Sequence, residues 1–165
     1  MSSSAVTSWQ AVLEKDLPLL GHRNWIVLAD SAYPWQTAPG VKTISTGGEQ
    51  LEVVQAVLQA VDDAPHVRPI IYTDAELPFL PEEDAPGITA YCMGLKNVLV
   101  GRSVHSLPHD RIIALLDEAG RAFHILLFKT TMTLPYTTVF VQLDCGYWSP
   151  QAEQKLREKF VPAVS

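Results

Sequence analysis

Two residues able to take part in acid–base chemistry flank a short apolar run near the N-terminus. His22 precedes residues 25–29, Trp-Ile-Val-Leu-Ala, and Asp30 follows them directly. An apolar run of this length is typical of a strand buried on both faces of an α/β sheet. Asp30 would then lie at the carboxyl end of the strand, where such sheets bind ligands. Histidine exchanges protons near neutral pH, because its ordinary pKa is about 6.5. The pattern indicates a candidate site for a polar ligand.

Each of these residues also has a plainer interpretation. Aspartate often caps a turn after a strand, and position alone supports this role for Asp30 about as well as ligand binding. His22, taken alone, is most simply a loop histidine. Residue types and spacing leave both alternatives open.

A metal site is not expected. His105 and His109 are four residues apart, which is the spacing of two ligands on one helical face. Pro108 interrupts such a helix, and no carboxylate follows in the order of a metal site. Cys92 and Cys145 are the only cysteines, so the sequence has neither a paired-cysteine zinc signature nor a disulfide framework.

The elements that must position these residues follow from the hydrophobic periodicity. A cap at Thr7 or Ser8 and a Ser149-Pro150 pair mark two helix starts. Apolar runs predict strands at 25–29, 41–46, 67–74, 88–93, 98–100, 123–128 and 138–143, and 3.6-residue spacing predicts helices at about 8–20, 49–61, 109–119 and 149–160. Alternating strands and helices predict an α/β fold with one central mixed sheet and helices packed on it. We expect a domain over residues 1–148 and a helical extension over 149–165.

Composition excludes several classes of protein. A chain of 165 residues fits one domain. The net charge of -6 and the pI near 5.2 argue against a nucleic-acid partner, which would require clustered Lys and Arg. The first seven residues lack the pattern of a signal peptide, and no stretch approaches the ~20 apolar residues of a membrane span. With only two cysteines, the expectation is a cytoplasmic protein without membrane contact.

Two sequence blocks carry a resemblance to a known family. Residues 20–34 read Leu-Gly-His, seven residues, then Asp-Ser-Ala-Tyr-Pro, and residues 135–141 read Pro-Tyr-Thr-Thr-Val-Phe-Val, with Gly146 beyond. In this order the blocks resemble the ribose pyranase and fucose mutarotase (RbsD/FucU-like) family, whose second block has Tyr, one residue, Asn and an apolar strand. Thr138 stands at the position of that Asn.

The resemblance implies an RbsD-like fold and an isomerase that interconverts ring or anomeric forms of a free monosaccharide. His22 would be the catalytic acid/base, and Asp30 would orient it or a sugar hydroxyl. Tyr136, Thr138 and His109 would bind the sugar. No metal or organic cofactor is implied, and a neighbouring subunit of a homo-oligomer would complete each site. A non-catalytic sugar-binding or regulatory protein on the same scaffold, or a structural assembly module, is the alternative.

Overall fold

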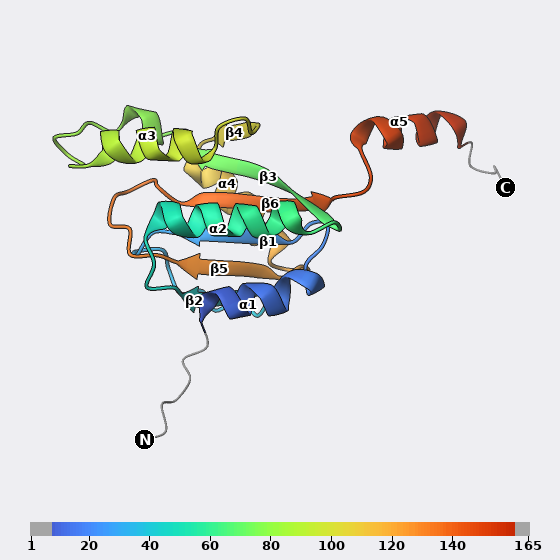
Figure 1. Ribbon diagram of the computed structural model, residues 1–165, viewed down its shortest axis with the longest axis horizontal. Coiled ribbons are helices and arrows are strands. Elements are labelled where there is room, and N and C mark those ends of the chain that lie inside the picture. The colour runs from blue at the N-terminus through green and yellow to red at the C-terminus, as the bar shows by residue number, and fades with distance from the viewer. Residues whose placement is uncertain (1–7, 161–165) are drawn as a thin grey trace, which may run out of the picture.

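A mixed sheet of six strands forms the centre of the molecule, in the order β2-β5-β1-β6-β3-β4 (Figure 1). The computed structural model describes residues 8–160. β6 runs antiparallel to its neighbours β1 and β3, and the other pairs are parallel. The strands are β1 (Trp25–Ala29), β2 (Val41–Ser45), β3 (Val67–Asp74), β4 (Val104–Leu107), β5 (Ile125–Lys129) and β6 (Val139–Cys145). The predicted α/β architecture with a central mixed sheet is confirmed.

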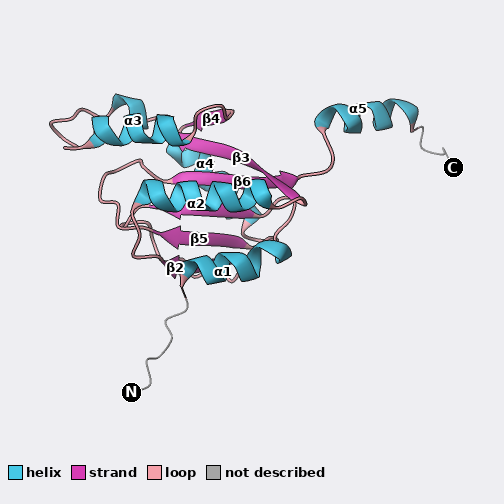
Figure 2. Ribbon diagram, in the orientation of Figure 1, coloured by secondary structure: helices cyan, strands magenta, loops and turns pink. Residues whose placement is uncertain are grey.

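Helices cover both faces of this sheet (Figure 2). α1, α2 and α3 contribute to one hydrophobic cluster, and α4 packs on the opposite face with Ile112 and Leu116. α5 lies beyond the end of the sheet. The helices are α1 (Trp9–Asp16), α2 (Gln50–Asp63), α3 (Ile88–Val98), α4 (His109–Ala119) and α5 (Pro150–Lys159), and short 3₁₀ turns occupy Leu17–Leu19 and Leu77–Phe79.

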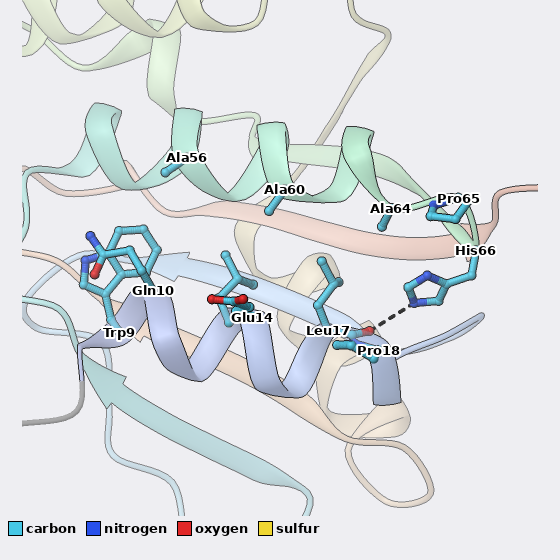
Figure 3. A pocket seen from close by; sticks show the side chains of 11 residues that line it. Trp9, Gln10, Glu14, Leu17, Pro18, Ala56, Ala60, Ala64, Pro65 and His66 are labelled. Atoms are coloured by element: carbon cyan, nitrogen blue, oxygen red, sulfur yellow. Dashed lines mark hydrogen bonds between the residues drawn. The ribbon is translucent and has the colours of Figure 1, made fainter.

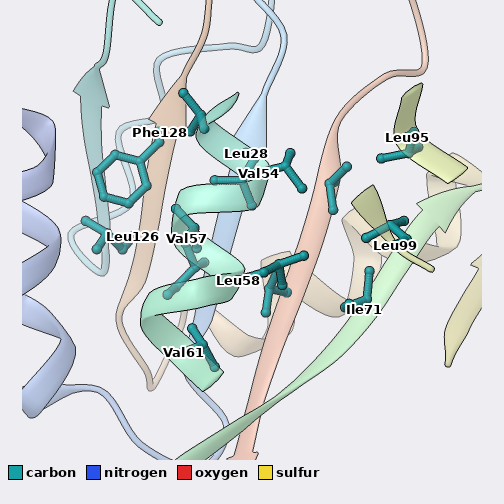
Figure 4. Close-up of a cluster of buried hydrophobic side chains, with 14 of the residues drawn as sticks. Leu28, Val54, Val57, Leu58, Val61, Ile71, Leu95, Leu99, Leu126 and Phe128 are labelled. Carbon is teal, nitrogen blue, oxygen red and sulfur yellow. The ribbon is translucent and has the colours of Figure 1, made fainter. Parts of the chain in front are cut away.

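The larger cluster lies between α2 and the sheet (Figure 4). Val57 and Leu58 of α2 are buried with Leu28 of β1 and Phe128 of β5. Complete burial of one such side chain stabilises the fold by about 1.5–3 kcal/mol. The Trp9 ring also packs against the Phe128 ring in a T-shaped arrangement, with 5.4 Å between ring centroids. This core fixes α2 and α1 against β1 and β5.

A buried amide links the core to the edge of the sheet where β1 ends. Gln50 donates from Nε2 to the carbonyl oxygens of Leu28 and Thr137, at 3.1 and 3.0 Å. Its Oε1 accepts from the Thr130 hydroxyl at 2.7 Å. Because Gln50 is completely buried, these bonds replace those it would make to water. They hold the entry to β6 beside the end of β1.

Two predicted strands are wrong. Residues 88–98 form one helix, α3, which begins after Gly87 in the left-handed conformation. Ile88, Tyr91 and Leu95 are buried at helical spacing, whereas the sequence interpretation took the apolar residues of 88–93 and 98–100 as strand runs. Strand β4 was missed because Val104-His-Ser-Leu is short and mostly exposed. The other predicted elements are present, with ends shifted by a few residues.

Candidate functional site

The carboxyl end of β1 presents Asp30 at the sheet edge where β6 begins. Thr138 donates its hydroxyl hydrogen to Asp30 Oδ1 at 2.7 Å, and the Asp30 backbone N–H donates to Thr138 Oγ1 at 3.3 Å. Thr138 is buried, while Asp30 is only partly buried. Thr138 therefore lies behind Asp30 and holds its carboxylate in place.

A histidine–aspartate pair lies at the same edge. His109 begins α4, and Asp74 is the last residue of β3. His109 Nδ1 lies 2.9 Å from Asp74 Oδ1, and the His109 backbone N–H donates to both Glu76 carboxylate oxygens, at 2.9 and 3.2 Å. Because Nδ1 contacts Asp74, Nε2 is the nitrogen that can face a ligand.

Burial controls the protonation of Asp74. Its side chain is fully buried, and its second oxygen, Oδ2, has no hydrogen-bond partner among the described residues. Loss of solvation raises the pKa of Asp74 above its ordinary value, although the hydrogen bond and charge of His109 oppose the rise. Asp74 therefore keeps its proton to a higher pH than an exposed aspartate would.

Tyr136 completes this group of side chains. Its backbone has φ of 58°, a left-handed conformation that aromatic residues rarely adopt. Its ring packs edge-to-face on the His109 ring, with centroids 5.7 Å apart and an interplanar angle of 88°. Uncommon backbone conformations of this kind concentrate at ligand sites, where the surrounding structure imposes them.

One open cavity of about 470 Å³ lies between the carboxyl end of β1 and the start of α4. Asp30, His109 and Tyr136 contribute polar atoms, and Tyr33, Pro135 and Ile113 contribute apolar surface. Burial raises the pKa of the Tyr33 phenol well above its usual range, so this hydroxyl stays protonated. The arrangement suits a small polyhydroxylated ligand, because it offers hydrogen-bond acceptors, donors and apolar walls together.

His22 lies at the other edge of the sheet. His22 lies before β1, and Asp30 lies directly after β1. The five residues of this strand alone separate His22 from Asp30 by about 17 Å. His22 Nδ1 lies 3.0 Å from Asp144 Oδ1, and Arg68 donates from Nε and Nη2 to Asp144 Oδ2 at 3.1 and 2.5 Å. Within one chain the structure thus brings together Asp30, His109, Tyr136 and Thr138, but not His22.

The charge at this second edge is set by Arg68. Partial desolvation raises the pKa of Asp144, but hydrogen bonds from Arg68 and the Cys145 backbone, the Arg68 charge and the His22 contact outweigh it. The net effect lowers the pKa of Asp144. Asp144 therefore stays ionised and orients the exposed His22 ring, whose side chain is 60% accessible.

Asp74 was missed by the sequence interpretation. It ends the predicted strand 67–74 as Asp30 ends the strand 25–29. The argument that selected Asp30, an aspartate at the carboxyl end of a buried strand, would have selected Asp74 as well. The contact between Asp74 and His109 could not be predicted from position along the chain, because the two residues are 35 positions apart.

Within residues 8–160, no three His, Cys, Asp or Glu residues are grouped so that they could hold a metal ion. None of the helices described there combines the length and the hydropathy of a membrane span.

Comparison with solved structures identifies the fold. No protein-family model matches the sequence, and no curated protein sequence does so either. The structure of RbsD from Bacillus subtilis complexed with D-ribose matches with 18% identity and a TM-score of 0.56, over 87% of this chain and 98% of that one.

Two fucose-related proteins match in the same way. FucU from Bifidobacterium longum is 17% identical, with a TM-score of 0.54 over 81% of this chain and 92% of that one. The fucose mutarotase from Streptococcus pneumoniae in complex with L-fucose is 19% identical, with a TM-score of 0.52 over 83% and 92%. The chain therefore has the fold of RbsD and FucU, as its two sequence blocks predicted.

Proposed function

We propose that this chain is a monosaccharide mutarotase or pyranase, an isomerase that opens and recloses the ring of a free sugar by acid–base catalysis. The observation that carries the proposal is that Asp30, His109 and Tyr136 line one cavity in a chain of this fold, with the buried Asp74 held against Nδ1 of His109. The D-ribose and L-fucose in two of the matching structures make pentoses and 6-deoxyhexoses the first sugars to test.

The reaction needs two proton transfers. One group removes the proton from the anomeric hydroxyl, whose electron pair forms the C1=O bond. The bond between C1 and the ring oxygen breaks, and the electron pair of that bond moves onto the ring oxygen. A second group then gives the ring oxygen a proton. Rotation about the C1–C2 bond and reclosure give the other anomer. Such catalysis is fastest when the acid and base titrate near the working pH.

The residues of the cavity suit these steps. His109 can present Nε2 to the sugar while Asp74 holds Nδ1, so the pair can take and return a proton. Asp30, held by Thr138, accepts a hydrogen bond from a sugar hydroxyl. The Tyr136 hydroxyl both donates and accepts, which suits a ligand with several hydroxyl groups.

His22 enters this proposal from a neighbouring subunit. It cannot reach its own Asp30 from the opposite edge of the sheet, yet it is exposed and oriented by Asp144. A ring placed in this way suits a contact with another molecule. We therefore propose a homo-oligomer in which His22 of one copy completes the cavity of the next as the second acid/base.

A non-catalytic sugar-binding or regulatory protein is the second candidate. The observation that favours it is Thr138, which replaces the Asn expected from the resemblance and engages its hydroxyl with Asp30. A threonine hydroxyl offers fewer hydrogen bonds than an amide.

Exchange NMR with ribose, fucose and other free sugars distinguishes the two. Accelerated anomer exchange supports the mutarotase, binding without exchange supports the second candidate, and no contact with any sugar contradicts both.

Mixing two inactive variants tests the shared site. His22→Ala and Asp30→Asn are each expected to lose exchange activity. If His22 acts in a neighbour's cavity, random 1:1 mixing restores about a quarter of the sites. In those sites the Asp30→Asn subunit supplies an intact His22 and the His22→Ala subunit supplies an intact Asp30. The control is a His22→Ala/Asp30→Asn double variant mixed with either single variant, which cannot form an intact site. No recovery in the first mixture, with subunit exchange demonstrated, would mean that the site lies within one chain.

A further inference from the structure

Helix α5 is well formed but packs on little of the described chain. None of its side chains is buried, and it lies apart from the helices that cover the sheet (Figure 1). Ser149 caps its start by accepting from the Ala152 N–H at 3.0 Å, and Pro150 occupies the first turn. An isolated helix of ten residues is marginal in water, since most helical stability comes from packing. A packing partner outside this chain would supply what is missing.

The apolar residues of α5 fall on one side. Ala152, Leu156 and Phe160 recur every four residues, which places them along one face of a helix. Leu156 is 48% and Phe160 59% exposed. Lys155 and Lys159 each precede an apolar residue and so flank this face.

A groove of complementary character runs between α1 and α2 (Figure 3). Its cavity volume is about 550 Å³. One wall is formed by Trp9 and Leu13 of α1 with Leu17 of the 3₁₀ turn after it. The other wall is formed by three alanines one turn apart, Ala56 and Ala60 of α2 and Ala64 at its end. The small α2 side chains leave room for larger ones between the helices. His66 closes one end, with Nε2 at 3.0 Å from the carbonyl oxygens of both Leu17 and Leu20.

The charges of the two surfaces also match. α2 carries Glu52, Asp62 and Asp63 and no Lys or Arg, and Glu14 of α1 lines the groove. By helical spacing, Glu52 continues the row of alanines by one turn and Asp63 lies beside it, while Lys155 and Lys159 lie along one side of the apolar face of α5. Opposite charges beside an apolar contact favour one orientation of the partner helix.

We propose that α5 of one copy of this chain seats in the α1–α2 groove of a second copy. Helix α5 of the same chain is less able to reach this groove, because the path of the chain as it leaves β6 is fixed. The Gly146 N–H donates to the His66 oxygen at 3.0 Å, and a Cβ on Gly146 would lie 2.8 Å from the Pro65 oxygen. Only residues 147–149 join this point to α5, which they direct away from α1. The inference does not depend on the proposed sugar chemistry.

Cysteine cross-linking tests the contact. In a background with Cys92→Ser and Cys145→Ser, one protein carries Ala60→Cys and a tagged second protein carries Leu156→Cys. The two are mixed and oxidised. We expect a disulfide between tagged and untagged chains on a non-reducing gel. The matched control replaces Leu156→Cys with Gln154→Cys, which lies on the opposite face of α5 and should form at least tenfold less cross-linked product.

Three results would overturn the proposal: no cross-link, equal cross-linking by the control, or a disulfide formed within one chain when both cysteines are on it. Sedimentation of Leu156→Asp in the natural cysteine background is an independent measurement. The domain should still fold and unfold cooperatively, because α5 buries nothing in it, while the assembly loses mass. An unchanged assembly contradicts the proposal. Absence of anomer exchange alongside a specific cross-link would refute the mutarotase and leave this contact standing.

Discussion

The two edges of the sheet each carry a histidine–aspartate pair of nearly equal length, 2.9 Å for His109–Asp74 and 3.0 Å for His22–Asp144. Their surroundings differ. Asp74 is fully buried with one oxygen lacking a partner among the described residues, whereas Asp144 is 22% exposed and bound by Arg68. Burial raises the pKa of Asp74, and Arg68 with its fellow donors lowers that of Asp144.

The difference shows how one pair of residue types serves two purposes. At the β3 end, the buried carboxyl of Asp74 holds a proton more readily and bonds to His109, which lines a cavity. At the β6 end, a carboxylate kept ionised by Arg68 fixes an exposed imidazole at the surface. Desolvation dominates in the first place and a neighbouring cation in the second.

The largest expected effect is on catalysis. His22→Ala should slow anomer exchange by about 10²–10⁴-fold, the contribution of general acid–base catalysis. It should leave the melting temperature unchanged, because the His22 side chain is 60% exposed. Exchange NMR near neutral pH and a thermal melt are the two measurements.

His124→Ala is the matched control, since His124 is also an exposed histidine. It should exchange anomers at the parent rate. Parent-like exchange by His22→Ala would remove His22 from the mechanism and leave the acid–base role to the His109–Asp74 pair.

The next largest expected effect is the pH dependence of stability, which should have opposite signs for Asp74 and Asp144. Because the folded-state pKa of Asp74 is raised, its contribution to stability is fully present below about pH 3.9, the ordinary value, and is lost as pH rises through the folded pKa. Asp74→Asn removes this loss. The unfolding free energy of the variant minus that of the parent should therefore increase as pH rises, by about 1.4 kcal/mol for each pH unit by which folding raises the pKa of Asp74. Urea unfolding between pH 4 and 8 measures it. A difference that does not vary with pH would contradict the assignment.

A smaller effect concerns Asp30, which depends on Thr138. Thr138→Val removes the hydroxyl that donates to Asp30 at 2.7 Å and should lower the unfolding free energy by about 1 kcal/mol. It should also weaken sugar binding, because the carboxylate is no longer held. Thr138→Ser keeps the donor and serves as the control. Equal sugar affinity in the two variants would show that Asp30 does not need this bond.

The smallest effect is at the exposed pair. With a lowered folded-state pKa, Asp144 contributes stability above about pH 3.9 that is lost as pH falls through the folded pKa. Asp144→Asn should therefore cost stability at neutral pH and nothing in strong acid, the opposite trend to Asp74→Asn. Partly exposed ion pairs contribute less than about 1 kcal/mol. Chemical unfolding at pH 3 and pH 7 is the measurement. A stability loss for Asp144→Asn that is larger at pH 3 than at pH 7 would contradict the prediction.

Local signals in the sequence predicted most of the elements. Continuous apolar runs identified β1 and β5, and capping residues located α1 and α5. The interpretation failed at α3, where residues 88–93 fit a strand and a helix comparably well, because so short an apolar stretch does not distinguish the two periods.

The sequence by itself determined the mixed α/β fold, the place of Asp30 at the end of a buried strand and the helical character of 150–159. Only the tertiary structure decided which distant residues meet. β6 runs antiparallel to β1, so its start brings Thr138 to Asp30 while its end brings Asp144 to His22. Spacing along one strand cannot reveal this, because the direction and register of pairing between strands depend on how the whole core packs.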